Sequence, residues 1–175
     1  MRARLDTIAR SAISQGRAAG AFTCYDLATA YGVVDAATEA GQGVVLLVSP
    51  STAARPYGPH LVRSLRALAD DAAVPVSVPL DHASDLDLIE RIVEAGADAV
   101  LVDGSKQGYD GNVELILQAR ERLAGRDVVL EAELGRIEGN EDVATLITSD
   151  AGELTDPAQA AEFVAEGNER YRKRL

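Results

Sequence analysis

Five short apolar runs alternate along this chain with longer stretches of helical periodicity, and this alternation limits the fold more than any other feature. Residues 44–48 are all apolar, which is typical of a strand buried on both faces. Pro75 and Pro79 cannot donate to a ladder, so they are predicted at the ends of a strand. The predicted strands span residues 18–24, 44–48, 74–80, 97–102 and 128–133.

A helix is predicted after each strand, and residues typical of helix ends support several of these assignments. Gly41 and Gly96 are expected to end two of the helices, and Ser84 is expected to be an N-cap. Asp156 before Pro157 predicts the start of the last helix. The predicted helices span residues 27–40, 60–73, 84–95, 112–123 and 157 to about 166.

Strands that alternate with helices form parallel sheets with right-handed crossovers, so an α/β protein is predicted. Both a doubly wound sheet and a barrel fit this pattern, but the glycine-rich dinucleotide fingerprint of many doubly wound proteins is absent. A complete β/α barrel typically takes ~250 residues, and the chain has 175. We predict an incomplete TIM-type (β/α) barrel of about five βα units over residues 1–166, followed by a frayed or disordered basic polar tail at 167–175.

The composition narrows the possible partners and the compartment. A net charge of −11 argues against nucleic-acid binding, because phosphates repel an acidic surface. No apolar stretch is long enough to span a membrane. The single cysteine, Cys24, allows no intrachain disulfide, which fits a cytoplasmic location, and it is predicted to be buried on a strand.

Polar residues follow each apolar run, and in β/α barrels the chemistry gathers at these strand ends. Asp81 and His82 end the third strand, Asp103 follows the fourth, and Glu133 ends the fifth. A single carboxylate at such a position is usually a helix cap or a solvated loop residue. One histidine and two carboxylates on one rim could instead hold a divalent metal ion. Adjacent side chains at a strand end are expected to diverge, so that one binds the metal and the other moves a proton.

Several motifs in order along the chain resemble those of the class II, zinc-dependent fructose- and tagatose-bisphosphate aldolases. They are GAF at 20–22, SPSTA at 49–53, LDH at 80–82, VDGS at 102–105, EAELGR at 131–136, GNED at 139–142 and TDP at 155–157. The resemblance covers the N-terminal portion of that family. It implies cleavage of a ketose 1,6-bisphosphate to dihydroxyacetone phosphate and an aldehyde, with Zn²⁺ as cofactor and a sugar bisphosphate as the molecule bound.

The resemblance also assigns roles to residues at the strand ends. Asp81 matches the catalytic aspartate that protonates the departing carbonyl oxygen. His82 matches the first zinc ligand. Asp103 and Glu133 match carboxylates that hold zinc in a resting position.

Two further positions match the family outside this group. Glu141 matches a catalytic acidic residue on a mobile loop, and Ser49 matches a residue that lines the substrate site. The family has two more zinc histidines, whereas this chain has only His60 and His82.

Because five units do not close a barrel, three explanations stay open: a truncated product, a complementary chain that brings the missing strands, or a diverged protein that self-associates. A non-catalytic sugar-phosphate-binding or self-associating pseudoenzyme is therefore the alternative function. A homo-oligomer or a complementary chain is the expected assembly.

Overall fold

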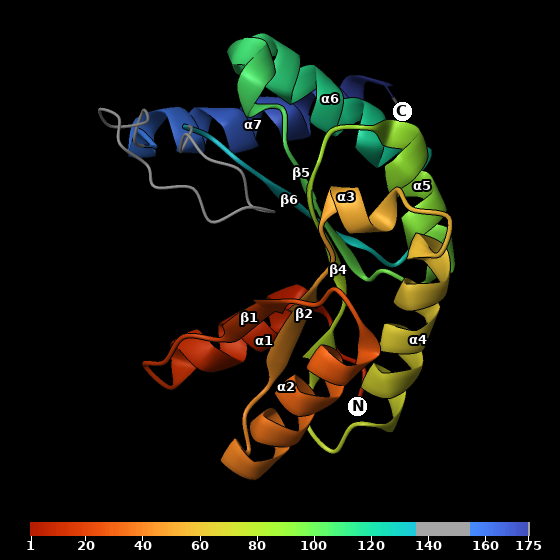
Figure 1. Ribbon diagram of the computed structural model, residues 1–175. Coiled ribbons are helices and arrows are strands. Elements are labelled where there is room, and N and C mark those ends of the chain that lie inside the picture. The colour runs from red at the N-terminus through yellow and green to blue at the C-terminus, as the bar shows by residue number, and fades with distance from the viewer. Residues whose placement is uncertain (136–154, 175) are drawn as a thin grey trace, which may run out of the picture.

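The computed structural model describes residues 1–135 and 155–174 (Figure 1). The helices are α1 Leu5–Ser14, α2 Leu27–Ala40, α3 Pro50–Ala53, α4 Gly58–Asp71, α5 Leu86–Ala95, α6 Gly108–Arg122 and α7 Pro157–Arg174, with a 3-10 helix η1 at Ser105–Gln107. The strands are β1 Gly20–Thr23, β2 Val44–Leu47, β3 Val76–Ser77, β4 Pro79–Ala83, β5 Ala99–Val102 and β6 Val129–Ala132. The prediction of an α/β protein with parallel strands is confirmed.

The strands follow one another across the sheet in the order in which they occur in the chain. β1, β2 and β3 form one parallel sheet, and β4, β5 and β6 form another. A bridge between Val48 and Leu80 joins the two sheets in the same register as the β2–β3 ladder. In the described residues β1 and β6 are edge strands, so the sheet is open rather than closed.

The third predicted strand, residues 74–80, forms two separate strands in the structure, β3 and β4. Pro75 directly precedes β3 and Pro79 is the first residue of β4, so both stand at strand ends as predicted. Only Val78 separates the two strands. Because proline has no N–H group, Pro79 contributes only its carbonyl oxygen, which accepts from the Val48 N–H at 3.0 Å.

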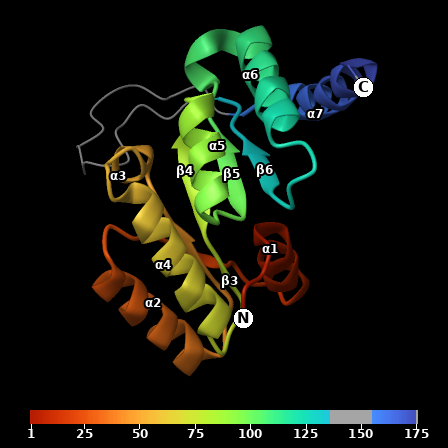
Figure 2. The ribbon, with the colours of Figure 1, turned by 90° about the vertical axis from the view of Figure 1, so that its right-hand side faces the viewer.

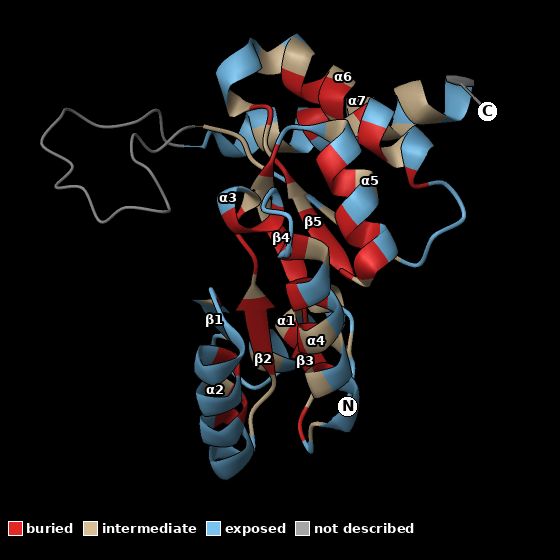
Figure 3. Cartoon of the chain, turned by 45° about the vertical axis from the view of Figure 1, so that its right-hand side comes forward, coloured by how far each residue is buried: buried red, intermediate tan, exposed pale blue. Residues whose placement is uncertain are grey.

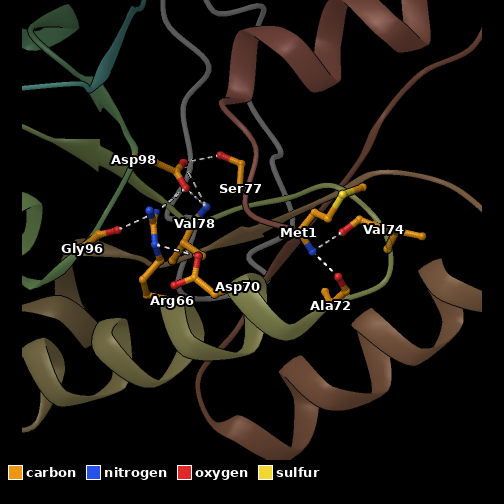
Figure 4. A network of polar contacts seen from close by, with 9 residues as sticks. All are labelled: Met1, Arg66, Asp70, Ala72, Val74, Ser77, Val78, Gly96 and Asp98. Carbon is orange, nitrogen blue, oxygen red and sulfur yellow. Dashed lines mark hydrogen bonds and ion pairs between the residues drawn. The ribbon is translucent and has the colours of Figure 1, made fainter.

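A buried carboxylate stabilises the backbone at this division (Figure 4). Both oxygens of Asp98 accept from the Val78 N–H at 3.1 Å, and the hydroxyl of Ser77 also donates to Asp98. Arg66 lies 3.2 Å from the same carboxylate. The pKa of Asp98 is raised, because burial raises it more than the hydrogen bonds from Ser77 and Val78 lower it. The carboxylate therefore supplies the partners that an uninterrupted ladder would otherwise provide.

The core lies between the sheet and a row of helices, in which α4 packs against α2 and α5, and α5 packs against α6. Figure 3 shows buried residues along the strands and on the sheet-facing sides of α4 and α5. Fully burying one large aliphatic side chain contributes roughly 1.5–3 kcal/mol. The largest fully buried side chains include Leu46, Val48, Val62, Leu65, Leu80, Ile89, Ile92, Val100 and Val102.

Helix α1 is absent from the prediction, and it lies on the other side of β3 from α2 and α4 (Figure 2). Leu5, Ala9 and Ile13 of α1 line a cavity of about 420 Å³ together with Leu47 and Leu101 from the strands. The apolar residues of α1 recur at helical spacing, which is the signal that predicts an amphipathic helix. This helix therefore covers part of the sheet face that the other helices leave open.

One predicted helix cap is misplaced by one residue. The N-cap of α5 is Asp85 and not Ser84, because the Asp85 carboxylate accepts from the N–H groups of Asp87 and Leu88. Gly41 and Gly96 do end α2 and α5 in the left-handed conformation, as predicted.

Helix α7 continues to Arg174 instead of ending near residue 166, so the expected frayed or disordered tail is helical over residues 167–174. Glu169 and Lys173 form an i,i+4 ion pair at 2.7 Å, and the Arg120 guanidinium of α6 stacks 3.8 Å from the Tyr171 ring. In the described part of the chain, no helix is both long enough and apolar enough to cross a membrane.

Candidate metal centre

A β-bulge at the end of β4 brings the Asp81 and His82 side chains close to each other. β4 pairs with β5 at Leu80 and again at Ala83, three residues later, while the partners on β5 are only two residues apart. His82 has a φ of 46°, which is unusual for a residue with a side chain. A bulge re-aims side chains, and here the His82 Nε2 atom lies 3.9 Å from Asp81 Oδ1. The expectation that these two side chains diverge was therefore wrong.

The ends of three adjacent strands converge on the His82 ring. Its Nδ1 atom lies 3.2 Å from Asp103 Oδ2, which follows β5, and 3.1 Å from Glu133 Oε2, which follows β6. The candidate ligand atoms of the three residues all lie within 4.8 Å of one another, and the side chains are partly buried. The structure thus brings together the three residues that the sequence analysis named as metal ligands, and their role as ligands stays a prediction.

The donor set suits a divalent cation. Zn²⁺ accepts imidazole nitrogen and carboxylate oxygen, and catalytic zinc sites commonly use three protein ligands with one position left open. Burial raises the pKa of Asp103, but hydrogen bonds from Ser105 and His82 oppose this, and the net shift is downward. A lowered pKa keeps Asp103 ionised and able to bind a cation.

A second pair of carboxylates lies beside this group, and the sequence analysis did not assign a role to one of them. Asp81 and Glu131 both line the cavity under α1. Desolvation raises the pKa of Glu131, and the nearby Asp81 charge raises it further against the opposing effect of His82. The fifth predicted strand runs to Glu133, and a two-residue spacing within a strand predicts side chains on the same face. That periodicity was the signal that could have identified Glu131.

The remaining predicted site residues lie apart from this group or outside the described residues. Ser49 is buried and caps α3, where its Oγ atom accepts from the Thr52 N–H at 3.4 Å. A contact between Ser49 and substrate stays a prediction. His60 is an exposed residue in the first turn of α4 and is not part of the metal-ligand group. Glu141 lies outside the described residues.

Comparison with known proteins decides the family. The family model described as fructose-bisphosphate aldolase class-II matches residues 3–170. This chain belongs to the class II fructose-bisphosphate aldolase family. The resemblance drawn from the motifs is thereby confirmed.

Two relatives indicate how much of the family this class II aldolase chain represents. It is 37% identical over 150 residues to the D-tagatose-1,6-bisphosphate aldolase subunit GatY of Klebsiella oxytoca, covering 86% of this chain and 52% of the relative. It is 34% identical over 158 residues to a fructose-bisphosphate aldolase of Thermus caldophilus, covering 90% of this chain and 51% of the relative. The chain therefore spans about half the length of these relatives.

Solved structures of aldolases share the fold of this class II aldolase chain. A candidate fructose-1,6-biphosphate aldolase from Coccidioides immitis superposes with a TM-score of 0.82 at 30% identity, over 94% of this chain and 57% of the other. The YdjI aldolase of Escherichia coli K12 superposes with a TM-score of 0.81 at 24% identity, over 96% of this chain and 58% of the other. The second likeness concerns the fold alone.

Proposed function

We propose that this chain takes part in the zinc-dependent cleavage of a ketose 1,6-bisphosphate, of the fructose or tagatose type, to dihydroxyacetone phosphate and an aldehyde. The observation that carries the proposal is the convergence of Asp103 and Glu133 on His82, at 3.2 and 3.1 Å, with Asp81 beside them. Family membership supports the same reaction class. The buried single cysteine fits a reducing cytoplasm as its location.

His82, Asp103 and Glu133 would hold the metal ion. A bound Zn²⁺ supplies a Lewis acid that stabilises the negative charge developing on a substrate carbonyl oxygen. The carboxylates neutralise part of the cation's charge, and the bulge at His82 presents the imidazole to the same point. These residues therefore account for the electrostatic part of the reaction.

Asp81 is proposed to move the proton at the carbon–carbon bond that breaks. In the cleavage direction its carboxylate accepts the proton of the hydroxyl group that becomes the aldehyde oxygen, and in the reverse direction it returns that proton. Glu141 is proposed to move the proton at the carbon next to the ketone. Ser49 is proposed to contact the substrate from the end of β2.

We further propose that the open sheet is the first part of a TIM-type barrel of about five βα units. Its consecutive parallel strand order and its row of helices along one face support this, and so do the aldolase neighbours. β1 and β6 each have an unpaired edge in the described residues. Full activity is therefore expected to need additional strands, from a complementary chain or from further polypeptide.

A second candidate is a non-catalytic protein that binds a sugar phosphate or associates with itself. The sequence contains two histidines, and the exposed His60 on α4 does not join the His82 group. A metal site with one histidine has fewer nitrogen ligands than the three-histidine site implied by the family resemblance. This candidate predicts a stable oligomer with little bound zinc.

A coupled assay that follows dihydroxyacetone phosphate tests the two candidates. The purified chain is incubated with Zn²⁺ and fructose or tagatose 1,6-bisphosphate, alone and with a polypeptide that carries the remaining strands of a relative. Zinc-dependent product that disappears in Asp81→Asn supports the aldolase. No product under either condition, from a folded chain that binds sugar bisphosphate, supports the non-catalytic candidate.

A further inference from the structure

A buried amide on α6 links the ends of β5 and β6. The Asn112 side chain is 2% exposed, and its Nδ2 atom donates to the main-chain oxygen of Glu133 at 2.6 Å. The same side chain lies against Gly104, the residue after Asp103. A Cβ atom at Gly104 would lie 2.5 Å from Asn112 Oδ1 and 2.7 Å from its Cα atom. Asn112 therefore lies between Gly104, which follows the candidate ligand Asp103, and the main chain of the candidate ligand Glu133.

The hydrogen bonding of Asn112 makes it a poor choice for stability alone. Its Oδ1 atom is buried and has no hydrogen-bond partner among the described residues. A buried acceptor without a partner costs at least as much free energy as one hydrogen bond contributes. An apolar side chain of similar size would avoid this cost, but it would also lose the hydrogen bond to Glu133. What the amide does provide is a fixed donor aimed at the Glu133 carbonyl oxygen.

We propose that Asn112 is a positioning residue of the metal centre. It holds the main chain at Glu133 against the end of β5, and it thereby sets the distances of the Glu133 and Asp103 carboxylates from His82. Gly104 is needed for this arrangement, because a side chain at that position would displace Asn112. This proposal rests on the proposed function, which identifies Asp103 and Glu133 as metal ligands.

The test replaces Asn112 by leucine, which has a similar size and no donor. The matched control is Asn168→Leu on α7, since the Asn168 amide oxygen accepts from Arg120 of α6 at 3.1 Å. Three properties are measured for each variant: thermal unfolding without metal, the crystal structure without metal, and Zn²⁺ affinity by competition with a chromophoric chelator. If Asn112→Leu does not fold, Asn112→Ala, which also lacks the donor, takes its place.

We expect Asn112→Leu to unfold within a few degrees of the wild type, to lose the short contact between Glu133 and His82, and to bind Zn²⁺ roughly 10–100-fold more weakly. Asn168→Leu is expected to keep both the contact and the affinity. An Asn112→Leu structure that retains the Glu133–His82 contact, with wild-type affinity, overturns the proposal.

The structures without metal separate this inference from the proposed function. If the wild type binds no zinc at this site, the proposed function fails. Displacement of Glu133 in Asn112→Leu still supports the positioning role, and an unmoved Glu133 overturns it.

Discussion

The Nδ1 atom of His82 lies 3.1 Å from Oε2 of Glu133, although β5 separates their two strands in the sheet. Strands two places apart in a sheet lie about 10 Å from each other, so side chains on regular strands seldom make such a contact. The bulge in β4 and the left-handed conformation of His82 shorten this distance. The candidate metal centre therefore depends on a local departure from regular strand geometry.

Replacing His82 by alanine should remove the nitrogen ligand from the group. We expect Zn²⁺ affinity to fall at least about tenfold, because two carboxylates alone bind zinc less well than a set with imidazole. His60→Ala is the control, since His60 is exposed on α4. Equilibrium dialysis with metal analysis measures both variants, and an equal loss in both would place the zinc elsewhere.

Replacing Asp98 by alanine should destabilise the fold where β3 and β4 meet. Val78 N–H and the Ser77 hydroxyl lose their acceptor, and Arg66 loses a buried partner. We expect the free energy of unfolding to fall by about 3–5 kcal/mol, as for other buried pairs broken on one side. Asp70→Ala removes an exposed partner of Arg66 and should change stability by less than about 1 kcal/mol. Urea unfolding distinguishes the two, and equal effects would contradict the account.

The ionisation of Asp98 should make the free energy of unfolding depend on pH. Its pKa in the folded chain is raised above the ordinary value of 3.8, chiefly by burial. The unfolded chain therefore releases this proton at lower pH, and the stability that protonated Asp98 contributes is lost as pH rises through the folded-state pKa. The difference in unfolding free energy between the wild type and Asp98→Asn should thus decrease as pH rises above 3.8. A difference that increases over that range would mean that the pKa is lowered.

Cys24 should react slowly with alkylating reagents in the folded chain. The thiol is buried, and burial together with the nearby Asp26 charge raises its pKa to about 11. Only the thiolate reacts, so at pH 8 we expect alkylation at least ~100-fold slower than for a free thiol. Mass spectrometry after iodoacetamide treatment measures the rate, with the urea-unfolded chain as the reference. Equal rates in the two states would show that Cys24 is accessible.

Much of the fold could be predicted from the sequence because local signals agree with the final structure. The apolar run of β2, the left-handed Gly41 and the prolines beside β3 and β4 all lie as the pattern indicates. The choice of Asp85 over Ser84 as N-cap was not predictable, since adjacent residues of similar capping ability compete for one position. The length of α7 depends on contacts such as the one between Arg120 and Tyr171, which join distant parts of the chain.

The residues of the candidate site could be named from the sequence, but their arrangement in space could not. Strand-end positions and motif content identify Asp81, His82, Asp103 and Glu133 without any knowledge of their distances. The bulge at His82 depends on the register between β4 and β5, which no local pattern encodes. The role proposed for Asn112 was not predicted either, because a single polar residue within a helix gives no indication of a carbonyl partner that is distant in the sequence.

Zinc anomalous scattering from crystals of the zinc-loaded chain tests the central claim most directly. We expect one strong peak within bonding distance of a His82 ring nitrogen and of carboxylate oxygens from Asp103 and Glu133, at about 2.0–2.2 Å. A fully occupied zinc peak at another place, with these three side chains unbound, would contradict the assignment of the metal centre.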